Sequence, residues 1–139
     1  MKTKLLSYQS LNTDLAALLL RLIFGGVMAH HGYSKFIAYD TILPMFGDII
    51  GIGSKLSFNL VIFAELFCAL FVVIGFLTRL SVIPILITMI VAFFIAHGKD
   101  PFQMKEVAFL FMTLSVVIFI LGSGRFSIDK LIFGNKENR

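Results

Sequence analysis

Four long apolar stretches constrain the fold of this chain more than any other feature of its sequence. They lie at residues 15–36, 56–77, 80–97 and 107–121. A helix rises about 1.5 Å per residue, so about 20 residues cross the roughly 30 Å hydrocarbon layer of a bilayer. Mean hydropathy is +0.96 and 14% of residues are charged, whereas about 25% are charged in soluble domains. The sequence therefore predicts an all-α fold, an integral membrane antiparallel four-helix bundle that occupies residues 1–139 as a single domain.

The helices are expected at residues 14–36, 56–77, 79–97 and 103–122, followed by a basic cytoplasmic tail at 123–139. The first of them lacks the short apolar core and the small-residue cleavage site of a signal peptide. We therefore expect it to be an uncleaved signal anchor.

The connection between the first two helices, residues 37–55, is long and partly apolar. Beside Pro44 and three glycines it holds six large apolar residues, Ile42, Leu43, Met45, Phe46, Ile49 and Ile50. It is too apolar for a free loop, and too short and broken for a span. We expect a partly apolar interfacial segment that caps the outer face of the bundle. Only Thr78 and Arg79 separate the second and third stretches, which indicates a tight antiparallel hairpin.

Basic residues are distributed unevenly between the two sides of the predicted bundle. Four spans place both termini on one side, which carries Lys2, Lys4, Arg79, Arg125, Lys130, Lys136 and Arg139. The opposite side carries Lys35, Lys55, Lys99 and Lys105. Because cytoplasmic segments of membrane proteins carry the excess of Lys and Arg, we expect both termini in the cytoplasm. Membrane lipids are then the first expected partner, with the basic tail on the anionic inner leaflet.

Several kinds of chemistry are absent from the sequence. The chain has one cysteine, Cys68, so it has no intramolecular disulfide and no Cys-x-x-Cys redox pair. It also has no nucleophile triad, phosphate loop or dinucleotide fingerprint. We expect no nucleotide cofactor and no nucleic-acid partner.

Glu65 lies near the middle of an apolar run, residues 58–77. A carboxylate at that depth costs about 2.5–3.5 kcal/mol unless it is paired, protonated or facing water. Arg21 lies about 11 Å past Asp14, and Glu65 about 14 Å past Leu56 from the opposite side, so their levels nearly coincide. An Arg21–Glu65 ion pair is one interpretation. In the other, Arg21 extends to the inner head groups and Glu65 is protonated.

A second group of polar residues is expected at the outer end of the bundle. His31 and Lys35 share a helix face, His97 ends the third helix and Glu106 begins the fourth, with Glu65 beneath them. Helix-end preferences explain His97 and Glu106 but not Glu65. A metal site is disfavoured because the Glu-x-x-His spacing of metal-binding bundles is absent. A third interpretation is a site for a membrane-soluble head group such as a quinone, with proton relay through a His or Glu.

The order of these motifs resembles the DoxX family from about residue 15 to 131. The residues that carry the resemblance are Arg21-Leu22, His31-Gly32-x-x-Lys35-Phe36, Glu65, Gly75-Phe76-x-Thr78-Arg79, His97, Glu106 and Gly122-x-Gly124-Arg125-x-Ser127-x-Asp129. The chain departs from the pattern at Ser123, where members often have proline. His30 does not belong to the pattern.

The resemblance implies a multi-pass protein of the bacterial inner membrane, a quinone-linked oxidoreductase subunit or quinone-stress protein that acts with a partner redox enzyme. The expected catalytic residues are Glu65, His31 and Glu106. The expected cofactor-binding residues are Arg21, His31, Lys35, Glu65, His97 and Glu106, with quinone as the cofactor and no metal. The alternative is a non-catalytic scaffold or assembly factor whose polar residues hold the helices together, and a homo-oligomer is a further expectation. Whether the chain turns over a substrate stays open at this point.

Overall fold

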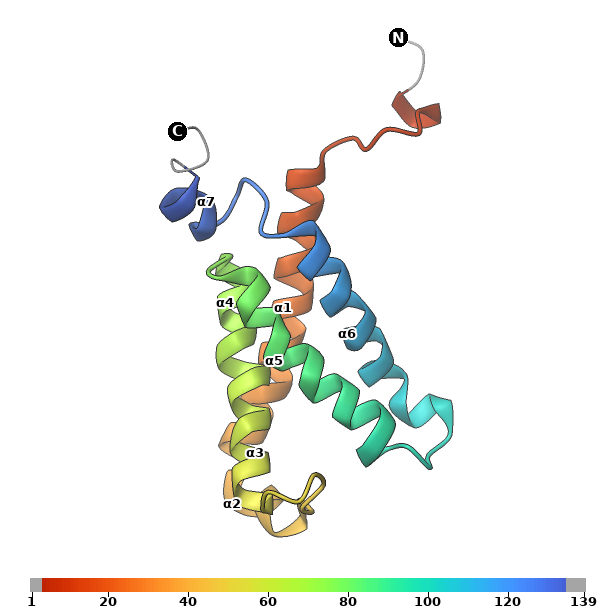
Figure 1. The fold of residues 1–139 in the computed structure, drawn as a ribbon, viewed down its shortest axis with the longest axis vertical. Coiled ribbons are helices and arrows are strands. Elements are labelled where there is room, and N and C mark those ends of the chain that lie inside the picture. Colours follow the sequence, from red (N-terminus) through yellow and green to blue (C-terminus); the bar gives the residue numbers. More distant parts are fainter. Residues whose placement is uncertain (1–3, 135–139) are drawn as a thin grey trace.

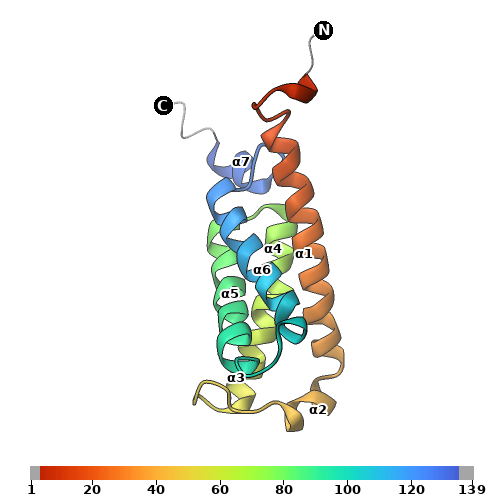
Figure 2. The same ribbon diagram turned by 90° about the vertical axis from the view of Figure 1, so that its right-hand side faces the viewer.

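The computed structural model describes residues 4–134 of the chain. Within that range four helical spans pack side by side and there is no strand (Figures 1 and 2). The spans are Thr13–Ile37, Ser54–Ile74, Thr78–Ala96 and Phe102–Leu121, each long and apolar enough to cross a membrane. The predicted all-α membrane bundle is therefore confirmed. Lys2 and the last residues of the predicted tail, including Lys136 and Arg139, lie outside the described residues.

The first and fourth spans are single α-helices, whereas the second and third each contain a π-helical segment, in which the turns are wider. The first span is α1 (Thr13–Ile37) and the fourth is α6 (Phe102–Leu121). The second span comprises α3 (Ser54–Ile62), the π-helical segment η3 (Phe63–Cys68) and α4 (Ala69–Ile74). The third comprises α5 (Thr78–Val91) and the π-helical segment η4 (Ala92–Ala96). The short elements are η1 (Lys4–Leu6), α2 (Tyr39–Ile42), η2 (Leu43–Met45) and α7 (Ile128–Phe133).

The bundle has two distinct ends (Figure 1). Helix α1 begins and α6 finishes at the end where α7 lies, which we call the terminal end. The opposite end, which we call the loop end, carries α2 and the turn between η4 and α6. Helix α1 packs along η3 and α4, while α5 packs along α6. The buried core between them includes Phe24, Met28, Val72, Ile85 and Ile118.

The second span ends three residues earlier than the apolar pattern indicates. Gly75 adopts a left-handed conformation, with φ 72°, and the N–H of Phe76 donates to the carbonyl of Phe71 at 2.9 Å. This is the arrangement with which glycine commonly terminates a helix. The hairpin turn is therefore Gly75 to Leu77, and Thr78 already belongs to α5.

The connection between α1 and α3 forms a cap over the loop end (Figure 2). Tyr39 and Phe46 place their rings 5.2 and 4.9 Å from the ring of Phe58, centroid to centroid. The hydroxyl of Tyr39 also donates to Asn59 Oδ1 at 2.7 Å. Aromatic contacts of this kind hold the partly apolar segment against α3, as the sequence predicts.

Candidate functional site

The site begins with a close approach of two helix backbones. At Gly32 of α1, a Cβ atom would lie 2.5 Å from the backbone carbon of Glu65. Only glycine fits at that separation, so α1 contacts η3 directly. The contact brings Lys35, one turn further along α1, beside Glu65.

Glu65 is buried and forms an ion pair with Lys35, whose Nζ donates to Glu65 Oε2. The exposed fraction is 6% for the Glu65 side chain and 30% for that of Lys35. Side chains lean toward the N-terminus of their own helix. In the antiparallel pair of α1 and the second span, Lys35 and Glu65 therefore lean toward each other. The ion pair joins the two spans and leaves the ammonium partly accessible.

The predicted ion pair of Arg21 with Glu65 is wrong, and so is the predicted extension of Arg21 to the head groups. Arg21 is 1% exposed and lies near the terminal end, where Nη1 donates to the carbonyls of Val73 at 2.9 Å and Val72 at 3.3 Å. Its Nη2 donates to the carbonyl of Phe126. Arg21 leans toward the terminal end and Glu65 toward the loop end, so the two side chains diverge. Arg21 ties α1 to the end of α4 and to the segment before α7.

Glu65 lies in the π-helical segment η3. Such wide turns are rare and occur often at functional sites. A second wide turn, η4, lies in the third span at the loop end. Both segments border the cavities described next, so the helices are widened where the polar residues gather.

Two cavities adjoin the ion pair. The larger, of 290 Å³, lies between the loop-end cap and the second and third spans, and most of its lining is apolar. The smaller, of 200 Å³, lies between α1, the third span and α6. The residues common to both are Lys35, Glu65, Ala92 and His97. A charged pair therefore lies between two largely apolar chambers.

Two predicted histidines also reach this region. His97 lines both cavities, and its Nδ1 lies 2.7 Å from Asp100 Oδ2, which leaves Nε2 as the other polar atom of the ring. His31 lines the smaller cavity and packs edge-on against Phe111 at 6.3 Å. The structure thus brings together four of the six predicted site residues, His31, Lys35, Glu65 and His97.

Glu106 does not join them. It is exposed on the first turns of α6 and lines neither cavity. No three His, Cys, Asp or Glu side chains in residues 4–134 are arranged to hold a metal ion.

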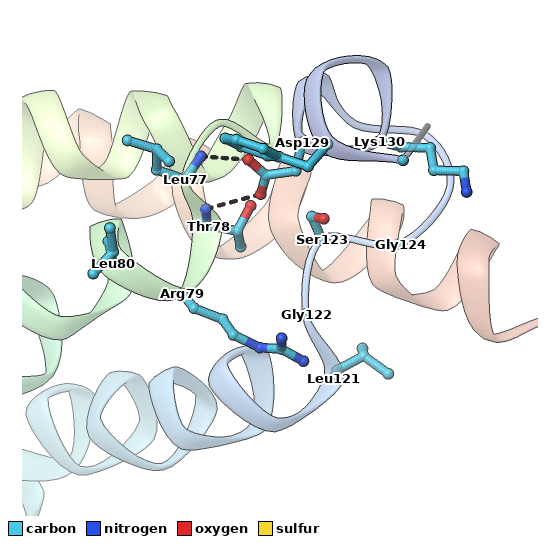
Figure 3. Close-up of a pocket in the computed structure, with 12 residues that line it drawn as sticks. Leu77, Thr78, Arg79, Leu80, Leu121, Gly122, Ser123, Gly124, Asp129 and Lys130 are labelled. Atoms are coloured by element: carbon cyan, nitrogen blue, oxygen red, sulfur yellow. Dashed lines mark hydrogen bonds between the residues drawn. The ribbon is translucent and has the colours of Figure 1, made fainter. Parts of the chain in front are cut away.

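A cavity of 420 Å³ lies at the terminal end, beside the turn between α4 and α5 (Figure 3). The Asp129 carboxylate accepts hydrogen bonds from the backbone N–H groups of Leu77 at 2.7 Å and Thr78 at 3.0 Å, which caps α5. Arg79 lies beside Gly122 (Figure 3) and donates from Nε to the carbonyl of Phe119 at 3.0 Å. None of the six predicted site residues lines this cavity. The hydrogen bonds of Asp129 and Arg79 around it join helix ends.

Sequence reasoning missed two residues of the site, Ser57 and Asp100. Ser57 lines the larger cavity and is 6% exposed. A single serine in an apolar run gives no sequence signal. Asp100 lies three residues after His97, a spacing that places two side chains side by side at a helix end and could have been recognised.

Comparison with known proteins gives a family and one relative. A family model described as DoxX matches residues 16–98, more than half of the chain. The chain is also 29% identical over 126 residues to "Putative oxidoreductase CatD" of Bacillus subtilis (strain 168), which covers 90% of this chain and 92% of that protein. No solved structure matches the chain.

Proposed function

The chain belongs to the DoxX family, and on that premise we propose that it binds a quinone head group and serves as the membrane subunit of an oxidoreductase. The observation that carries the proposal is the Lys35–Glu65 ion pair at the wall of the 290 Å³ cavity. The relative that matches nine-tenths of the chain carries the name "Putative oxidoreductase CatD", which supports the redox class.

The cavity fits a substituted ring in size and lining. A cavity of about 150 Å³ holds benzene, so 290 Å³ accommodates one ring with substituents. Leu60, Val61 and Ile87 offer apolar walls to the ring. Binding sites for small molecules typically combine such walls with a few fixed polar groups.

The polar residues supply the rest of the chemistry. A bound quinone would accept two electrons and two protons to become a hydroquinone. Lys35 donates a hydrogen bond to a ring oxygen, and Glu65 holds the Lys35 ammonium in place. His97, which is 45% exposed and paired with Asp100, passes protons between the cavity and water, because imidazole nitrogens can both donate and accept a hydrogen bond. His31 extends this path into the smaller cavity.

Electrons come from a partner redox enzyme in this proposal, since the chain has one cysteine and no nucleotide motif. We place the protein in the bacterial inner membrane with both termini in the cytoplasm. The excess of Lys and Arg on the side of the bundle that carries both termini supports that orientation.

Quinone content tests the proposal. The protein is purified in native-lipid particles, extracted, and its quinone measured by mass spectrometry beside a Glu65→Gln variant. We expect stoichiometric quinone in the wild type and its loss from a variant that is still folded. Background quinone in both would contradict the proposal.

A second candidate function is a non-catalytic scaffold. The carbonyl bonds of Arg21 and the interhelical Lys35–Glu65 pair favour it, because both join helices. In that case the wild type holds only background quinone. Glu65→Gln then lowers the melting temperature of the bundle and leaves the quinone content unchanged.

A further inference from the structure

Ser57 carries a hydroxyl group that the fold does not use. The residue is 6% exposed, and its Oγ has no hydrogen-bond partner among residues 4–134. Buried polar groups in proteins are nearly always hydrogen-bonded, so an exception calls for an explanation. Ser57 lines the same 290 Å³ cavity as the Lys35–Glu65 pair.

Other hydroxyl groups in the spans show what the usual solution is. Thr88 Oγ1 donates to the carbonyl of Pro84 at 2.8 Å, and Ser115 Oγ to that of Phe111 at 2.6 Å. Both bonds reach back one helical turn, the common arrangement for Ser and Thr within helices. The Ser57 hydroxyl makes no such bond and stays available to a ligand.

Ser57 and Glu65 lie at two different levels of the same cavity. The two residues are eight apart in the second span, which puts them on neighbouring parts of one face and about 12 Å apart along the axis. Glu65 leans back toward Ser57. A ligand that contacts both Ser57 and the Lys35–Glu65 pair therefore needs polar atoms at two separate positions in the cavity, which suits one ring with an oxygen at each end.

We propose that Ser57 is the second anchor of the cavity and selects rings that carry two oxygens in para positions. The inference rests on the proposed function and names its substrate class. The Lys35–Glu65 pair holds one oxygen and Ser57 the opposite one. A hydroxyl both donates and accepts, so Ser57 donates to a quinone carbonyl and accepts from a hydroquinone hydroxyl. The contact is kept in both redox states.

The test compares two ligands on matched variants in nanodiscs. The ligands are a short-chain alkyl-1,4-benzoquinone and an alkylphenol with a single ring oxygen. The variants are Ser57→Ala, Ser57→Thr and the control Ser115→Ala, whose hydroxyl bonds within its own helix. We expect Ser57→Ala to weaken benzoquinone binding about tenfold, as for one hydrogen bond, and to leave alkylphenol binding unchanged. Ser57→Thr keeps the preference for benzoquinone, and Ser115→Ala alters neither affinity.

The outcomes separate this inference from the proposed function. Equal benzoquinone affinity in wild type and Ser57→Ala, together with loss of binding in Glu65→Gln, would overturn the role of Ser57 alone. An equal loss of both ligands in Ser57→Ala would overturn it as well, since the residue would then only shape the cavity. If the wild type binds neither ligand, the proposed function fails and this inference with it. The melting temperature of Ser57→Ala should equal or exceed that of wild type, because an unpartnered hydroxyl is removed.

Discussion

Replacement of Lys35 by methionine removes the partner of the buried Glu65 carboxylate. Methionine keeps the length of the apolar stem, so the change is mainly one of charge. Loss of one member of a buried ion pair costs about 3–5 kcal/mol. Because the Lys35 side chain is 30% exposed, we expect the lower end, about 3 kcal/mol, or roughly 150-fold in the unfolding equilibrium.

The double variant Lys35→Met/Glu65→Leu separates pairing from packing. With both charges gone, no uncompensated charge remains in the bundle, so most of the stability should return. The assay is equilibrium unfolding by SDS in mixed micelles, followed by circular dichroism, on the wild type, both single variants and the double variant. A free-energy loss below about 0.5 kcal/mol for Lys35→Met would refute the reasoning. So would a double variant as unstable as the sum of the single variants.

Three further predictions use the same unfolding assay. Gly32→Ala should cost about 1–3 kcal/mol of unfolding free energy, because its Cβ would overlap the backbone of η3. The control Gly26→Ala has open space around it and should be neutral or slightly stabilising. Equal effects of the two substitutions would argue against the close approach. Arg21→Lys should cost about 2 kcal/mol, since one ammonium cannot reach all the carbonyls that the guanidinium bonds, and a stability equal to wild type would contradict this role. Asp129→Ala should cost about 1 kcal/mol through loss of the α5 cap, and an unchanged α5 N-terminus in amide hydrogen exchange would count against it.

The fold could be predicted from the sequence because the length of each apolar stretch shows whether it can cross the bilayer as a helix. The exact ends could not, since they depend on local bonds. Gly75 and Phe76 are apolar enough to continue the second span by composition, but the left-handed glycine ends the helix at Ile74.

The site could be predicted in part. The depth of each residue follows from helix rise, and this placed His31, Lys35 and His97 near one level. The partner of Glu65 could not be found from depth alone, because the direction in which each side chain leans decides which cation it meets. Glu106 shows a second limit, since the sequence gives its level but not the rotation of α6 about its own axis.

Photo-crosslinking with an azido-quinone in native-lipid particles tests the central claim most directly. Mass spectrometry of the labelled peptides would give the positions of attachment. We predict labelling at the segments that line the larger cavity, which are Lys35 and residues 46–50, 57–65 and 87–97. We also predict competition by unlabelled quinone and loss of label in Glu65→Gln. Labelling spread over the exposed apolar side chains of the spans, without competition, would contradict the claim that this cavity is a quinone site.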